Sequence, residues 1–200
     1  MEKFTITITR QFGSMGRTIA RQLAEELGTE FYDRDIVEEV SRKLNLPVSQ
    51  ISESEEKSEY RFWSRMFPLG NDEANIQSSI FDAQKSIILD LAQKSSCIIV
   101  GRCSDAILEE ANVENVINIY IYAPVQKRLE NCITRLGMDE TEAKRTIAQV
   151  DKARDAYHKQ YAGFLPSDLA HKQLMIDSSL LGPEKTAHWI AELIKERFGE

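Results

Sequence analysis

Residues 4–28 read FTITITRQFGSMGRTIARQLAEELG, and this stretch decides what kind of fold the chain can adopt. Its first part, Phe4–Thr9, alternates with a period of two and is rich in β-branched residues, which predicts a strand. Gly13 and Gly16 interrupt that pattern. Apolar residues then recur at helical spacing as far as Gly28, a residue type that commonly ends helices. The stretch therefore predicts a strand, a glycine-containing turn and an amphipathic helix, in that order.

The remainder of the chain continues this alternation. Cys97–Val100 is apolar throughout, which is typical of a parallel strand covered on both faces. Asp139 and Glu142 have the spacing of a capping box at the start of a helix. The other patterns predict strands at 31–32, 116–122 and 174–176, and helices at 36–44, 73–94, 105–110, 124–136, 139–161 and 183–198. We therefore predict an α/β fold with a parallel sheet between two layers of helices.

Composition and charge limit the classes of function. The chain has 200 residues, which suits one domain, and 32 acidic against 25 basic residues give a net charge of -7. This balance argues against binding to a nucleic-acid polymer but not against small phosphorylated ligands. The cysteines Cys97, Cys103 and Cys132 have no metal-binding spacing and suit a reducing compartment. No signal sequence or membrane-spanning run is visible, so we expect a cytoplasmic protein without a membrane partner.

The turn between the first strand and the first helix is a candidate phosphate-binding loop. Main-chain N–H groups at the start of a helix point toward an anion, and the helix dipole adds to the attraction. Compared with the motif G-x-x-x-x-G-K-[ST], Gln11 replaces the first glycine and Arg17 replaces the lysine. The alternative is an ordinary turn whose glycines only permit tight packing. We expect the phosphates of ATP to contact Gly13, Ser14, Met15, Gly16, Arg17 and Thr18, with the Thr18 hydroxyl also available to Mg²⁺.

Four segments resemble motifs of the cytidylate kinase-like family of P-loop proteins. Ile8–Arg17 is similar to the phosphate loop of that family, and Phe31–Asp33 to its second-strand motif. Val100–Arg102 resembles the Gly-Arg step that follows a buried strand. The fourth segment matches the family pattern D-x-x-R-x-x-Y-H-x-x-Y at Asp151, Arg154, Tyr157, His158 and Tyr161. The four segments also occur in the family's order along the chain.

The resemblance implies a three-layer P-loop NTPase fold of the nucleoside-monophosphate kinase type, formed by residues 1–200 as a single domain. A helical insert at 47–72 would bind the acceptor, and residues 124–161 would form a helical lid and the helix that follows it. The implied reaction transfers the γ-phosphoryl group of ATP, with Mg²⁺, to a small nucleotide such as CMP or dCMP. The implied catalytic residues are Arg17, Arg128 and Arg154, and the implied substrate-binding residues are Asp33, Arg34, Arg102, Asp151 and Arg154.

Several alternatives remain open at this point. The departures at Gln11 and Arg17 are also compatible with a P-loop protein that binds nucleotide without turnover, as a sensor or scaffold. The acceptor could instead be a shikimate-like acid or a nucleoside. Asp151 and Arg154 are three positions apart on a helix and could form a surface ion pair. Arg128, seven positions before Arg135, could belong to a solvated basic stripe.

Overall fold

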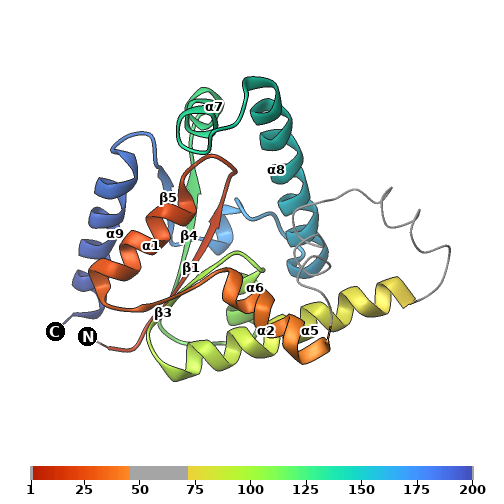
Figure 1. Ribbon diagram of the computed structural model, residues 1–200. Coiled ribbons are helices and arrows are strands. Elements are labelled where there is room, and N and C mark those ends of the chain that lie inside the picture. Colours follow the sequence, from red (N-terminus) through yellow and green to blue (C-terminus); the bar gives the residue numbers. More distant parts are fainter. Residues whose placement is uncertain (1, 46–71, 200) are drawn as a thin grey trace.

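The structure is a computed structural model that describes residues 2–45 and 72–199 (Figure 1). Within these ranges the strands form one five-stranded parallel sheet in the order β2-β3-β1-β4-β5. The strands are β1 (Thr5–Arg10), β2 (Glu30–Tyr32), β3 (Cys97–Val100), β4 (Val116–Tyr122) and β5 (Leu174–Asp177). The helices are α1 (Gly16–Leu27), α2 (Arg34–Leu44), α5 (Asp72–Lys94), α6 (Ser104–Glu110), α7 (Val125–Thr134), α8 (Glu140–Ala162) and α9 (Gly182–Phe198), with a 3-10 turn, η1, at Leu169–His171.

The strand β1 lies at the centre of the sheet, and its register determines which residues meet at the carboxyl edge. Ile8 is opposite Val100 of β3 on one side and Ile119 of β4 on the other. The segments that leave β1, β2 and β3 therefore emerge next to one another. In open parallel sheets, ligands bind at this edge.

The two faces of the sheet are covered by different helices. On one face, Ile6 and Ile8 of β1 pack with α1 and α9 in the largest apolar cluster (Figure 1). On the other face, Ile99 of β3 packs with α2, α5 and α6. The threonines of β1 point to this second side, where Thr7 Oγ1 donates to Asn118 Oδ1 at 2.7 Å. The second face of the central strand is therefore buried but polar.

The predicted three-layer α/β architecture is confirmed. The helix and strand bounds agree with the patterns to within a few residues, and Asp139 Oδ1 accepts the N–H of Glu142 at 2.8 Å, as a capping box requires. Pro124 is the residue before α7 rather than its first helical residue, which is a small correction. The predicted insert at 47–72 lies almost entirely outside the described residues. The lid at 124–161 and the single domain stay predictions. None of the described helices is both long enough and apolar enough to cross a membrane.

Candidate active site

The loop between β1 and α1 adopts a conformation that can hold an anion. Gly13 and Met15 have left-handed backbones, with φ of 77° and 61°, and α1 begins directly afterwards. Left-handed residues next to right-handed ones direct successive N–H groups into one concavity. Among the described residues, no protein acceptor bonds to the main-chain N–H groups of Gly13, Met15, Gly16, Arg17 or Thr18. These N–H groups are therefore available to a phosphate.

Gln11 explains why this loop does not need the first glycine of the general motif. The backbone of Gln11 is not left-handed, since the left-handed positions in the loop are Gly13 and Met15. Its N–H donates to Ile121 O at 3.0 Å, and its side-chain Oε1 accepts the N–H of Ala123 at 3.2 Å. Gln11 thus joins the loop to the end of β4. The departure from the motif at this position is therefore structural and does not occupy the N–H groups of Gly13 or Met15–Thr18.

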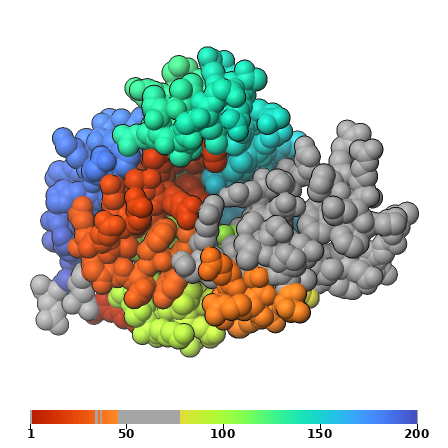
Figure 2. Space-filling view, in the orientation of Figure 1, coloured from red at the N-terminus to blue at the C-terminus, as the bar shows by residue number. Residues whose placement is uncertain are grey.

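The helix α7 packs directly on the phosphate loop. A Cβ on Gly13 would lie 2.8 Å from the main-chain oxygen of Arg128, so a larger residue there would collide with α7. Asn131 Nδ2 donates to Gly13 O at 2.9 Å. In Figure 2, α7 and the start of α8 (green to teal) lie on the residues that follow β1 (red). The glycine is therefore required both for its backbone and for this close approach.

A carboxylate of α8 also contacts the loop. Asp151 Oδ1 accepts the N–H of Phe12 at 2.7 Å, and its Oδ2 lies 2.5 Å from Arg128 Nη1. Arg128 Nη1 donates in addition to Phe12 O at 3.2 Å. The Arg128 side chain is 6% exposed, so it is no part of a solvated basic stripe, whereas Arg135 is exposed at the end of α7. Both predicted residues thus lie at the loop, bound to each other and to its main chain.

Three further motif residues of α8, Arg154, Tyr157 and Tyr161, join this helix to two other elements. Arg154 Nη1 donates to Arg10 O at 3.1 Å, at the end of β1. Tyr157 Oη donates to Gln84 Oε1 on α5 at 2.8 Å, and the Tyr161 ring stacks on Phe81 of the same helix. The described contacts of Asp151 are with Phe12 and Arg128, so the predicted surface ion pair with Arg154 is not among them.

Asp33 lies between two arginines at the start of α2. Its Oδ2 is 2.7 Å from Arg17 Nε, and its Oδ1 is 3.9 Å from Arg102 Nη2. Burial lowers the pKa of Arg102 to about 10; the charge of Asp33 opposes this effect, and the nearby charge of Arg10 contributes to it. Arg102 itself has a left-handed backbone, with φ of 62°. The Asp33 carboxylate therefore holds one arginine of α1 and one that follows β3.

A pocket opens at this edge of the sheet, between the ends of β1 and β3 and the inner face of α8. Three arginines line it, and they come from three different elements. Burial and positive charge together favour an anionic ligand. The residues that line it include Arg10, Gly101, Arg102, Arg154, Tyr157 and, beyond the end of α8, Pro166.

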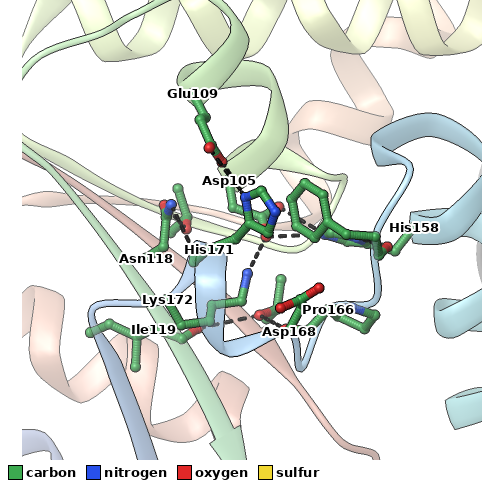
Figure 3. A network of polar contacts seen from close by, with 12 residues as sticks. Asp105, Glu109, Asn118, Ile119, His158, Pro166, Asp168, His171 and Lys172 are labelled. Carbon is green, nitrogen blue, oxygen red and sulfur yellow. Dashed lines mark hydrogen bonds and ion pairs between the residues drawn. The ribbon is translucent and has the colours of Figure 1, made fainter.

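A buried network next to this pocket was not predicted from the sequence (Figure 3). Asp105, in the first turn of α6, forms an ion pair with Lys172, and both side chains are fully buried. His158 Nε2 lies 3.0 Å from both oxygens of Asp105, and its Nδ1 donates to Phe164 O at 2.9 Å. Burial alone raises the pKa of Asp105, but the hydrogen bond and charge of His158, followed by the charge of Lys172, outweigh it and lower the pKa to about 2.

The structure brings most of the predicted site residues together. Arg17, Asp33 and Arg102 form one group, and Arg128 and Asp151 form another at the phosphate loop. The side chain of Arg34 lies outside the described residues. Arg10 lines the pocket although the sequence motifs place it only in the phosphate loop; its position at the end of β1 is the signal that points to the pocket. Asp105 and Lys172 gave no local signal.

The cytidylate kinase-like family model matches residues 5–180 of this chain. The chain belongs to the cytidylate kinase-like family. A cytidylate kinase of Methanopyrus kandleri is 26% identical over 189 residues, covering 90% of this chain and 88% of that protein. Membership of the family confirms the prediction of a kinase, and the family resemblance seen in the sequence is confirmed with it.

Solved structures of other proteins show the same fold. A protein of Eubacterium ventriosum superposes with a TM-score of 0.72 at 23% identity, covering 96% of this chain and 99% of that chain. A shikimate kinase of Acinetobacter baumannii, in complex with shikimate, gives a TM-score of 0.56 at 18% identity, covering 99% and 96%. At these identities the likeness concerns the fold alone.

Proposed function

We propose that this kinase transfers the γ-phosphoryl group of ATP to a nucleoside monophosphate, with CMP or dCMP as the acceptor. One observation carries the proposal: available main-chain N–H groups of the phosphate loop and a pocket lined by arginines lie at the same edge of the sheet. Phosphoryl transfer requires alignment and charge neutralisation more than covalent chemistry. An anion nest beside a cationic pocket supplies both.

On the donor side, the N–H groups of Gly13 and of Met15–Thr18 would hold the β- and γ-phosphates, with Arg17 beside them at the start of α1, whereas the N–H of Ser14 already donates to Gln11 O at 3.4 Å. The half-buried Thr18 hydroxyl has no protein partner among the described residues and is an oxygen donor of the type that Mg²⁺ takes. Thr18 would therefore hold the metal. When bound, Mg²⁺ supplies charge neutralisation on the donor phosphates.

On the acceptor side, Arg102 and Arg154 would bind the phosphate of the monophosphate, because guanidinium groups grip phosphate oxygens through two parallel hydrogen bonds. The oxygens of Asp33 and Asp151 already accept from arginines or main chain. We therefore propose that both carboxylates position the arginines and the loop. A catalytic role for Arg128 stays a prediction, since its described contacts are with Asp151 and Phe12.

The test is acceptor-dependent release of ADP by the full chain at fixed ATP and Mg²⁺. The acceptors are CMP, dCMP, UMP, AMP and GMP, with cytidine and shikimate as members of other acceptor classes. We expect the highest rates with CMP or dCMP. Binding of ATP without release of ADP for any acceptor would favour a nucleotide sensor, and release with shikimate or cytidine alone would favour a different kinase. Arg17→Ala, purified in the same way, controls for contaminating kinases.

A further inference from the structure

Arg10, the last residue of β1, has a side chain that runs between two glycines. A Cβ on Gly16, at the start of α1, would lie 2.8 Å from the Cβ of Arg10. A Cβ on Gly101, which follows β3, would collide with Nη1 of the Arg10 guanidinium. The two glycines thus provide the space through which this side chain passes. It starts at the phosphate loop and ends at the carboxyl end of β3.

At that end, Arg10 lines the pocket together with Arg102 and Arg154. The three arginines lie close to one another. Arg154 Nη1 donates a hydrogen bond to Arg10 O, and the positive charge of Arg10 contributes to the lowered pKa of buried Arg102. None of the described residues that line the pocket is acidic. Asp33, the carboxylate that lies against Arg102, is shared with Arg17. The pocket therefore gathers three cationic side chains, which suits a multiply charged anion such as a phosphate.

We infer that Arg10 is a substrate-binding residue that contacts the phosphate of the acceptor, reaching it from the donor side of the site. This inference rests on the proposed function. The side chain spans from the loop that would hold ATP to the pocket that would hold the acceptor, so its guanidinium would face the acceptor phosphate beside the donor phosphates. A cation at this place offsets the repulsion between donor and acceptor and stabilises the charge of the group in transfer.

The test measures binding of CMP and of cytidine to the full chain by isothermal titration calorimetry, with the donor site saturated by a non-hydrolysable ATP analogue and Mg²⁺. The variants are Arg10→Met, which keeps the length of the stem, and Arg10→Lys, which keeps the charge. The matched control is Arg21→Met, an exposed arginine on α1 away from the pocket. Steady-state KM and kcat for CMP are measured on the same proteins.

We expect Arg10→Met to weaken CMP binding by about tenfold or more, because a charge-assisted hydrogen bond to the phosphate is lost. Cytidine, which has no phosphate, should bind as tightly as it does to the wild type. Arg10→Lys should fall between the wild type and Arg10→Met, and Arg21→Met should match the wild type. A purely structural role would instead weaken CMP and cytidine equally. If Arg10→Met does not fold, the CMP-to-cytidine comparison in Arg10→Lys decides the question.

The outcomes separate this inference from the proposed function. If the wild type releases ADP with CMP but Arg10→Met binds CMP as tightly as the wild type does, the inference fails and the proposed function stands. If the wild type phosphorylates no monophosphate, the proposed function fails. Binding of inorganic phosphate alongside the ATP analogue then decides: its loss in Arg10→Met supports an anion site at Arg10, and equal binding by both proteins overturns it.

Discussion

Asp151 and Phe12 are joined by a hydrogen bond of 2.7 Å, in which the main-chain N–H of Phe12 donates to the carboxylate. The second oxygen of the same carboxylate lies 2.5 Å from Arg128. Phe12 directly precedes the left-handed Gly13, so one side chain of α8 fixes the start of the phosphate loop and holds α7 beside it. The position of the loop thus depends on a residue that is 139 positions away in the chain.

Replacing Asp151 should therefore affect both stability and turnover. Asp151→Asn keeps the shape of the side chain but removes the charge opposite buried Arg128. We expect the free energy of unfolding to fall by about 3 kcal/mol, the order found when one partner of a buried pair is lost, and ADP release to decrease. Urea unfolding and steady-state kinetics measure the two effects. Asp155→Asn, exposed one turn further along α8, is the control, and an unchanged unfolding energy in Asp151→Asn would contradict this role.

Arg17→Ala should reduce turnover strongly while leaving the fold intact. An arginine that neutralises the transferred phosphoryl group contributes about a thousandfold or more to the rate. The Arg17 side chain is 52% exposed, and such ion pairs add little stability, so the melting temperature should not change measurably. Arg21→Ala, one turn along α1, should retain full activity. Near wild-type release of ADP by Arg17→Ala would remove this residue from the mechanism.

Arg154→Ala should impair transfer through the acceptor. The side chain lines the pocket, and its described hydrogen bond to the main chain of Arg10 is part-buried at the edge of the sheet rather than within an apolar core. We expect a higher KM for CMP, a lower kcat and a retained melting temperature. Arg154→Lys preserves the charge but not the planar fork and should recover part of the loss. A collapse of the melting temperature in Arg154→Ala would show that the residue is structural.

The network of Asp105 should make stability depend on pH in the acid range. Its pKa is lowered from 3.8 to about 2 in the folded chain, so its contribution is fully present above about pH 4 and is lost as the pH falls toward 2. From the size of the shift, this contribution is about 2 kcal/mol. Asp105→Asn should have a lower free energy of unfolding than the wild type at pH 7, and this difference in free energy should shrink between pH 4 and 2.

Urea unfolding at intervals from pH 2 to 7 measures this difference. Asp90→Asn, at an exposed position on α5, should follow the wild-type pH dependence. If the difference in unfolding free energy between Asp105→Asn and the wild type stayed constant from pH 4 to 2, the Asp105 carboxylate would not be stabilised in its charged form by His158 and Lys172.

The elements of the fold could be predicted because their signals are local. The period of two at Phe4–Thr9 and the helical spacing up to Gly28 reflect which side chains face a core, and both are visible within a few residues. The same holds for the capping box at Asp139. The order of the strands could not be predicted, because β1 lies between β3 and β4, which follow it by about a hundred residues.

The site was predicted in part for the same reason. The phosphate loop and the motif of α8 are local patterns, and their residues do lie at the carboxyl edge of the sheet. Their partners are not local. Asp33 was expected to bind substrate, yet its nearest described partner is Arg17, and Asp105 finds Lys172 at a separation of 67 positions. Burial accounts for both pairings, since a buried charge requires an opposite charge and the fold determines which residue supplies it.

The amino-acid sequence by itself determined the alternation of strands and helices, the glycine-containing turn before α1, and the family to which the motifs belong, because backbone preferences act between near neighbours. The tertiary structure alone decided that Arg10 passes between Gly16 and Gly101, and that α8 holds the phosphate loop through Asp151. These relationships arise from strand order and helix packing, which bring together side chains that no local pattern connects.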